Sequence, residues 1–120
     1  MVSIKRFEDI VAWSKSRELT NKMYRTFDGN RDFGFRDQIQ RASVSIMNNI
    51  AEGYERRSTK DFSRFLVIAK ASCGEVRSML YLAEDLEYIS EEKRIELQNL
   101  SIEISKLISG FIESIKDYQS

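Results

Sequence analysis

The sequence contains no histidine, the commonest general base of enzymes and the commonest transition-metal ligand. Di-iron sites in helical bundles use Glu-x-x-His pairs, and none can be formed here. Cys73 is the only cysteine, so it cannot form a zinc site and, as a nucleophile, it lacks a histidine partner. The five glycines are scattered singly, and no phosphate-binding glycine loop is present. We therefore expect no enzymatic activity, no cofactor and no metal site.

Proline is also absent, and helix breakers are scarce in a chain of 120 residues with five glycines. This scarcity favours long helices over the many turns of an all-β fold. No stretch approaches the roughly 20 apolar residues that cross a bilayer, and residues 1–8 lack the apolar run of a signal peptide. One cysteine forms no intrachain disulfide. These absences predict a cytoplasmic protein that does not cross a membrane.

Charge of one sign does not dominate, because 19 basic residues balance 19 acidic residues. The distribution is uneven: residues 1–30 carry a net charge of +2, residues 31–77 of +3 and residues 78–120 of −5. A basic face is therefore compatible with the zero total. Acidic side chains gather at Glu84, Asp85 and Glu87, which we interpret as a solvated helix end in preference to a divalent-cation site.

Two amphipathic helices are predicted in the first half of the chain, because apolar residues recur there at spacings of three and four. The first spans about residues 9–27, with Ala12, Ser16, Leu19, Met23 and Phe27 on one face. Asp28-Gly29-Asn30 supplies turn chemistry, and Asp32 is placed to cap a second helix. Phe35, Ile39, Ala42, Ile46 and Ile50 continue that helix, and Gly53 is predicted to lie just beyond its last turn.

Two further helices are predicted in the second half. Ser58-Thr59-Lys60-Asp61 resembles a capping box, and the apolar stripe that follows to Leu86 contains Cys73, which we expect in the core. Gly74 costs about 1 kcal/mol in mid-helix, which predicts a close backbone contact there. Ser90 is placed to cap the fourth helix. The residues Ile95, Ile102 and Ile112 lie partly off the main stripe of that helix, which indicates contact with another subunit.

Four amphipathic helices joined by short links predict one domain over residues 1–120. The expected fold is all-α, an antiparallel up-and-down four-helix bundle. No linker, low-complexity tract or repeat divides the chain.

One segment is more distinctive than the rest. Residues 41–54 read RASVSIMNNIAEGY and lead through ERRS at residues 55–58 to FSRFL at residues 62–66. Together with FEDIVAW at residues 7–13, FGFRDQI at residues 33–39 and IAKASCGE at residues 68–75, this pattern resembles the four-helix bundle proteins encoded in intervening sequences of bacterial 23S ribosomal RNA genes. The resemblance covers about residues 7–90. Two departures are Met47, where the family often has proline, and Asp28-Gly29, in a link that often contains proline.

The resemblance implies a homopentameric ring of bundles and no assigned biochemical activity. Related accessory proteins of diversity-generating retroelements use such a ring, with a basic surface, to bind nucleic acid and a reverse transcriptase. By that analogy, RNA or DNA and a reverse transcriptase are expected partners, although one fold hosts many functions.

The expected nucleic-acid site surrounds the junction of the second and third helices. Its basic residues attract phosphate and its tyrosine can stack on an unpaired base: Arg41, Arg56, Arg57, Lys60, Arg64 and Tyr54. A solvated rim of ion pairs with Glu52, Glu55 and Asp61 explains the same residues, and both interpretations stay open.

Other polar and aromatic residues of this region are predicted to be structural or to line a subunit interface. They are Asn48, Asn49, Glu52, Gly53 and Trp13. Buried amides need partners, so the asparagines are expected to bridge helices or line a subunit contact. The leading hypothesis is a non-catalytic homo-oligomer that binds nucleic acid or a ribonucleoprotein. The alternative is a protein–protein scaffold that binds no nucleic acid.

Overall fold

The structure is a computed structural model that describes the backbone of residues 4–119 and the side chains of residues 4–116. Within that range, a short 3-10 helix and four α-helices follow one another: η1 (Phe7–Asp9), α1 (Val11–Thr26), α2 (Phe33–Glu55), α3 (Thr59–Asp85) and α4 (Glu91–Gln119). No strand occurs among these residues, so the expected all-α class is confirmed for the described chain. None of the described helices is both long and apolar enough to span a bilayer.

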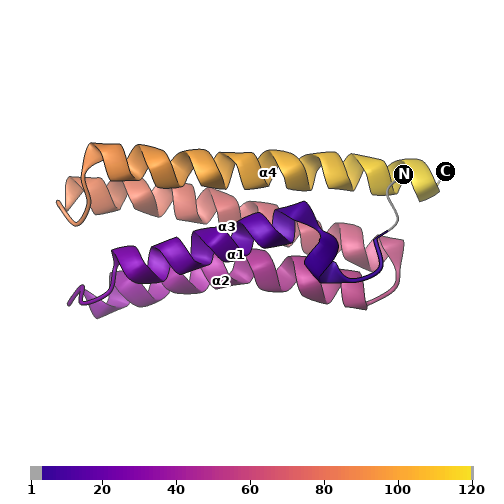
Figure 1. The fold of residues 1–120 in the computed structure, drawn as a ribbon, viewed down its shortest axis with the longest axis horizontal. Helices are drawn as coiled ribbons and strands as arrows, with labels where there is room; N and C mark the ends of the chain where they lie inside the picture. Colours follow the sequence, from indigo (N-terminus) through magenta and orange to yellow (C-terminus); the bar gives the residue numbers. More distant parts are fainter. Residues whose placement is uncertain (1–3, 120) are drawn as a thin grey trace.

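Each helix runs antiparallel to the next, and α4 returns beside α1 (Figure 1). In the described chain α1 packs against α2 and α4, and α3 packs against the same two helices, whereas no Cα atoms of the diagonal pairs approach within 8 Å. The α1–α2 and α3–α4 links lie at one end of the bundle, which we call the acidic end (Figure 1). The α2–α3 link and the segment before α1 lie at the opposite end, the α2–α3 end.

The predicted helix starts are confirmed by their caps. The Asp32 side chain accepts a hydrogen bond from the Phe35 N–H at the start of α2. Ser58 Oγ accepts from the Asp61 N–H at the start of α3, and Ser90 Oγ accepts from the Lys93 N–H before α4. Each cap satisfies one of the amides that a first helical turn leaves without a backbone partner.

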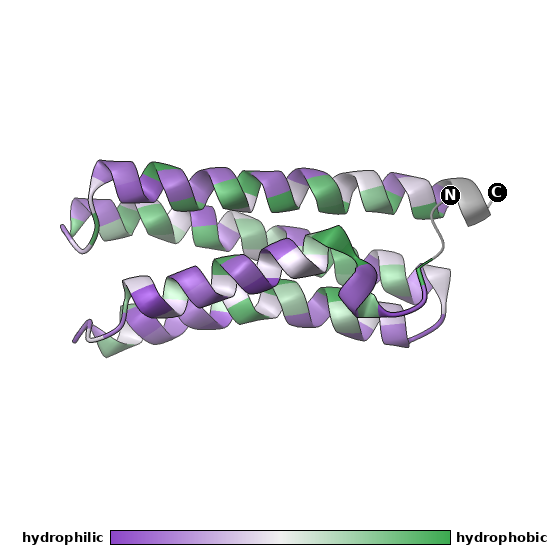
Figure 2. Ribbon diagram, viewed as in Figure 1, coloured by the Kyte–Doolittle hydropathy of each residue, from purple (hydrophilic) through white to green (hydrophobic). Residues whose placement is uncertain are grey.

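Apolar side chains fill the interior between the four helices. Green and purple segments alternate along every ribbon in Figure 2, as amphipathic helices require. The interior residues with no exposed surface include Leu19, Ile39, Ile46, Cys73 and Ile104. Burial of apolar surface is the main force that holds such helices together.

Hydrogen bonds from polar side chains fix the register between neighbouring helices. Ser101 Oγ donates to the Cys73 carbonyl at 3.2 Å, and the Gln98 amide donates to the Arg77 carbonyl at 3.1 Å. These two bonds join α4 to α3. The Ser45 and Ser72 hydroxyls lie 3.0 Å apart and join α2 to α3.

Two glycines differ from their predicted roles. Gly53 lies inside the last turns of α2, not beyond the helix, because α2 continues to Glu55. A β-carbon on Gly53 would lie 2.7 Å from the β-carbon of Phe65, so glycine allows α2 and α3 to approach closely. The close contact predicted at Gly74 is wrong for the described chain, because a β-carbon there would meet no atom within 4 Å.

Candidate nucleic-acid interface

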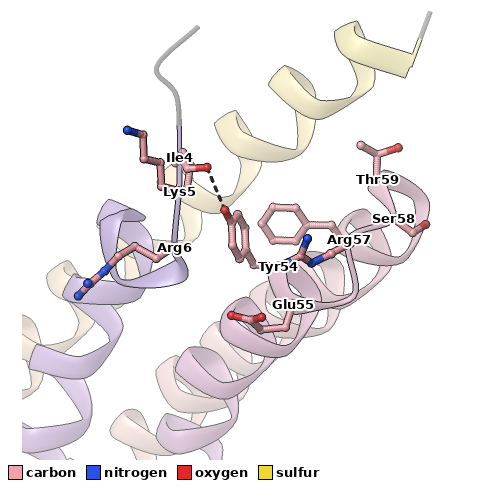
Figure 3. A pocket seen from close by; sticks show the side chains of 9 residues that line it. Ile4, Lys5, Arg6, Tyr54, Glu55, Arg57, Ser58 and Thr59 are labelled. Atoms are coloured by element: carbon pink, nitrogen blue, oxygen red, sulfur yellow. Dashed lines mark hydrogen bonds between the residues drawn. The ribbon is translucent and has the colours of Figure 1, made fainter.

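A cleft of about 600 Å³ opens at the α2–α3 end of the bundle. Residues 4–6 form one side of it, and Tyr54 and Glu55 with residues 57–59 form the other (Figure 3). Phe62 of α3 also lines the cleft. Segments that are fifty residues apart in the sequence therefore meet at this cleft.

The backbone of the α2–α3 link determines which side chains reach the cleft. The Arg57 N–H donates to the Tyr54 carbonyl at 3.3 Å, and Arg57 has a φ of 61°. A positive φ is uncommon for residues other than glycine, and here it ends α2 within one residue. The chain then extends to Ser58, which caps α3. This sharp reversal leaves the Arg57 side chain exposed beside Tyr54 (Figure 3).

Tyr54 ties the segment before α1 to the end of α2. Its hydroxyl donates a hydrogen bond of 2.9 Å to the Ile4 carbonyl, drawn as a dashed line in Figure 3. Its half-buried ring packs edge-on against Phe62, with 5.9 Å between ring centroids. The tyrosine therefore has a structural role in this cleft, whether or not its ring also meets a base.

Two of the predicted cations are held by carboxylates. Arg56 pairs with Glu52 at 2.7 Å and Arg64 with Asp61 at 3.4 Å. Both guanidinium groups also lie over the ring of Phe65, at 4.9 and 5.6 Å from its centroid. The hydrogen bond that Arg56 donates to the Glu52 carboxylate raises the pKa of Arg56 above its ordinary value. These contacts match the solvated-rim interpretation for Arg56 and Arg64.

Arg57 and Lys60 are exposed and form no ion pair with any residue in the range 4–116. Lys5, which the sequence analysis missed, also lines the cleft without an ion pair, although its side chain extends away from Tyr54 (Figure 3). Arg6 beside it pairs with Glu8 and Asp9 at 3.7 and 3.9 Å. Three cations are thus available to a phosphate group at this end of the bundle.

The structure does not bring Arg41 to this cluster. Arg41 lies on α2, fifteen residues before Arg56, which is about 22 Å along a helix. It lines a groove of about 260 Å³ between α1 and α2, together with Tyr24 and Val44.

The residues predicted to be structural or interfacial have varied surroundings. Asn48 is exposed, and the Asn49 amide donates to the Ser45 carbonyl at 2.8 Å within α2. Neither asparagine bridges two helices in the described chain, so the bridging prediction is wrong there, and the subunit contact stays a prediction. Glu52 holds Arg56, and Gly53 packs against Phe65. Trp13 is half-buried, and its ring meets Phe7 edge-on at 5.1 Å.

No group of three carboxylate or thiol side chains comes together as metal ligands would, in the part of the chain that the structure describes. Glu84, one of the clustered acids, forms an ion pair with Arg94 across the α3–α4 link. Asp85 and Glu87 are exposed at the acidic end. This surrounding fits the solvated helix end that the sequence predicted.

Comparison with known proteins identifies relatives without an assigned activity. Residues 8–110 match the family model of the 23S rRNA-intervening sequence protein. A crystal structure of a protein with unknown function from the S23 ribosomal protein family of Bacteroides thetaiotaomicron is also similar. It has 32% sequence identity and a TM-score of 0.79, over 85% of this chain and 98% of that chain. No functionally curated protein matches the chain.

Proposed function

The chain belongs to the 23S rRNA-intervening sequence protein family, and we propose that it acts without catalysis, as a homo-oligomer that binds nucleic acid or a ribonucleoprotein at the α2–α3 end. The observation that carries the proposal is an open cleft lined by Lys5 and Arg57, with the exposed Lys60 three residues after Arg57 in the first turn of α3. Cations without an internal partner gain most from a phosphate, because no ion pair has to be broken first.

Other features of the cleft favour a nucleic acid over a free anion. The half-buried ring of Tyr54 borders the same opening as Arg57, whereas Phe62 belongs to the buried core. An unpaired base stacks on a ring such as that of Tyr54, and its phosphate reaches cations beside it. The positive end of the α3 helix dipole also lies at the cleft, because α3 begins at Thr59, which lines it.

Self-association is the second part of the proposal. The resemblance implies a ring of five copies, and the exposed Ile95 and Ile102 of α4 support contact with another subunit. A ring repeats the cleft around one axis, so weak phosphate contacts add up on one nucleic-acid molecule. A reverse transcriptase is the protein partner that the resemblance implies.

Salt-titrated binding tests the nucleic-acid site. The purified, nuclease-treated protein is mixed with an RNA hairpin and with a DNA duplex at about 50 mM salt and then at rising salt. We expect retention at low salt and a salt slope that falls by about two in the double variant Arg57→Ala/Lys60→Ala. The matched control is Arg31→Ala/Lys106→Ala, which removes two exposed cations that also lack ion pairs, away from the cleft.

Failure to retain either nucleic acid at about 50 mM salt would remove this part of the proposal. Equal loss in the control variant would also contradict it, because binding would then follow total charge and not the cleft.

The alternative function is a protein–protein scaffold without nucleic-acid binding. The exposed apolar side chains of α3 and α4 favour it, and the zero net charge is consistent with it. Recovery of a stoichiometric protein partner in a pull-down that nuclease does not change would support this alternative.

A further inference from the structure

One face of α3 leads from the α2–α3 cleft toward the acidic end. Its residues follow one another at spacings of three, four and seven, and they are Lys60, Val67, Lys70, Gly74, Arg77 and Tyr81. Side chains at these spacings share one side of a helix. Gly74, Arg77 and Tyr81 of this face line a groove of about 400 Å³ between α3 and α4, two helices that lie side by side in Figure 1. Gln98 of α4 lines the groove from the other helix.

The cations of this face have no carboxylate beside them on α3. Lys70 and Arg77 are exposed and form no ion pair with any residue of the described chain. Glu75 is the only acidic residue in the range 62–83, and it accepts a hydrogen bond of 3.4 Å from the amide of Gln38 on α2. Its carboxylate therefore lies on the α2 side of α3 and not in the groove.

The nearby acidic residues of α4 are also turned away, toward α1. Glu96 pairs with Lys22 at 3.1 Å and Glu103 with Lys15 at 3.8 Å, and both lysines belong to α1. The groove between α3 and α4 thus carries positive charge with no carboxylate in its lining. A row of such cations attracts the phosphates of a nucleic acid.

Tyr81 gives the groove an aromatic surface. Tyr81 is 57% exposed, and the guanidinium group of Arg94 lies over its ring at 4.9 Å from the centroid. Arg94 is itself held by an ion pair with Glu84 and by a hydrogen bond of 2.6 Å to the Gln98 side chain. These contacts support the ring from one face, and an unpaired base can stack on its exposed surface.

Gly74 leaves the middle of the groove open. A β-carbon there would meet no atom of the described chain within 4 Å, although glycine costs about 1 kcal/mol relative to alanine inside a helix. A ligand that approaches the helix closely gives the glycine a role, because no side chain stands in its way. The Ser78 hydroxyl lines the same groove and is a donor of the kind that phosphate and sugar oxygens accept.

We infer that a single strand of nucleic acid leaves the α2–α3 cleft along this face of α3 and places a phosphate on Arg77 and a base on Tyr81. The inference rests on the proposed function and adds the strand type and a second contact. From Lys60 to Arg77 the helix rises about 25 Å, which corresponds to about seven nucleotides at about 3.4 Å each. A duplex keeps its bases stacked on one another and offers none to Tyr81. The exposed carboxylates of Asp85 and Glu87 repel phosphate and end the path.

Fluorescence anisotropy with labelled oligothymidylates and oligouridylates tests the path. Strands of about four, eight and sixteen nucleotides are titrated with the protein at about 50 mM salt, beside a duplex of the greatest length. We expect a large gain in affinity from the shortest to the middle strand, because the middle strand fills the path. The longest strand should bind more tightly than the duplex. Equal affinity for the two shorter strands, or a preference for the duplex, would overturn the inference.

Variants of Tyr81 test the stacked base. Tyr81→Ala removes the ring and should weaken binding of the middle strand about tenfold, whereas Tyr81→Phe keeps the ring and should bind as the wild type does. Tyr24→Ala is the matched control, because Tyr24 is an exposed tyrosine of α1. Circular dichroism checks that each variant is helical. Equal losses in Tyr81→Ala and in either of the other two variants would contradict stacking on Tyr81.

The double variant Lys70→Ala/Arg77→Ala tests the phosphate contacts. Each phosphate contact of a single strand contributes about 0.7 to the salt slope, so the slope should fall by about 1.4. Arg25→Ala/Arg41→Ala is the matched control, because these exposed cations of α1 and α2 also form no ion pair in the described chain. An equal fall in the control would show that binding follows total charge and not this face.

Gly74→Leu fills the groove without changing the charge. Leucine has a higher helix propensity than glycine, so the helix is retained. Gly110→Leu is the matched control, since Gly110 is an exposed helix glycine with equally open surroundings outside the groove. We expect weaker binding in Gly74→Leu alone, with the wild-type mass in light scattering. A changed mass would assign the groove to a contact between copies and overturn the inference.

Failure of this inference is distinct from failure of the proposed function. A wild type that binds none of the nucleic acids would refute the proposed function. Weaker binding in Arg57→Ala/Lys60→Ala with unchanged binding in the variants of Lys70, Gly74 and Tyr81 would refute only the path along α3. Polyglutamate that displaces the labelled strand as well as an unlabelled strand does would assign this face to an acidic polypeptide instead.

Discussion

The α-carbon of Gly53 lies so close to Phe65 that a β-carbon built on it would stand 2.7 Å from the β-carbon of Phe65. It would also lie 3.0 Å from the ring of Phe62. The β-carbon of Phe65 is fixed by the α3 backbone, so a side chain at this point of α2 would force the two helices apart. The contact joins the two helices that carry the candidate nucleic-acid interface.

Gly53→Ala should destabilise the protein by about 1–3 kcal/mol, as overpacking of a close contact does. Alanine has a higher helix propensity than glycine and stabilises an open helical position, so a loss of stability in Gly53→Ala indicates steric overlap with α3. The matched substitution Gly110→Ala should stabilise by up to about 1 kcal/mol, because its surroundings are open. Urea unfolding measures both values. Equal effects at the two glycines would contradict the close approach.

Tyr88→Phe should lower stability only while Asp32 is ionised. The Tyr88 hydroxyl donates a hydrogen bond of 2.6 Å to the Asp32 carboxylate and joins the two links at the acidic end. This bond lowers the pKa of Asp32 below its ordinary 3.8, with a smaller effect of the Phe35 N–H, and raises the pKa of Tyr88 above its ordinary 10.0. The hydrogen bond contributes its full stabilisation between pH 3.8 and pH 10.0, the two ordinary pKa values. It is lost as pH falls through the lowered pKa or rises through the raised one.

The measurement is the difference in unfolding free energy between wild type and Tyr88→Phe across pH. We expect a constant difference near neutrality that shrinks toward about pH 2.5. If the difference does not change with pH, the hydroxyl contributes through the packing of the Tyr88 ring against Phe35 and not through the hydrogen bond to Asp32.

Cys73 should resist alkylation in the folded protein. Burial raises the pKa of its thiol from 9.0 to about 11, although Ser101 and Arg77 act in the opposite direction. Two pKa units reduce the thiolate fraction at pH 8 about 100-fold, and burial blocks access as well. Iodoacetamide labelling followed by mass spectrometry measures the rate. The same protein in denaturant is the control, and similar rates in both conditions would contradict burial.

Tyr54→Phe should loosen the segment before α1 without removing the ring from the cleft. The lost hydrogen bond to the Ile4 carbonyl is worth about 1 kcal/mol, or about a fivefold change in an opening equilibrium. The amides of Asp9 and Ile10, which bond to residues 6 and 7, should therefore exchange faster with deuterium. Tyr24→Phe is the control, since the exposed Tyr24 hydroxyl has no hydrogen bond in the described chain. Unchanged exchange at Asp9 and Ile10 would show that the bond does not hold this segment.

Local signals in the sequence predicted the helices well. The starts at Asp32, Ser58 and Ser90 depend on side chains three residues from the amides they cap, so neighbouring residues determine them. The end of α2 was predicted too early because Gly53 was interpreted as a helix stop. Its actual role depends on Phe65, a residue of another helix.

The candidate site was predicted in part. Arg56, Arg57, Lys60 and Arg64 lie within nine residues of one another around a single link, so any fold with that link keeps them together. The sequence was sufficient to predict that Arg41 lies apart from the other four cations, because fifteen helical residues span about 22 Å. Lys5 could not be assigned from sequence, since its segment reaches the cleft through tertiary contacts, which include the hydrogen bond between Tyr54 and Ile4 and the packing of Ile4 and Phe7 against the core.

The sequence by itself determined the four helices, their caps and which faces are apolar, because these follow from periodicity and from contacts between residues three or four apart. Only the tertiary structure decided which cations remain unpaired, why Gly53 must be small while Gly74 has free space, and which apolar faces stay exposed. Those properties depend on the distance between side chains of different helices, and that distance exists only after the helices have packed.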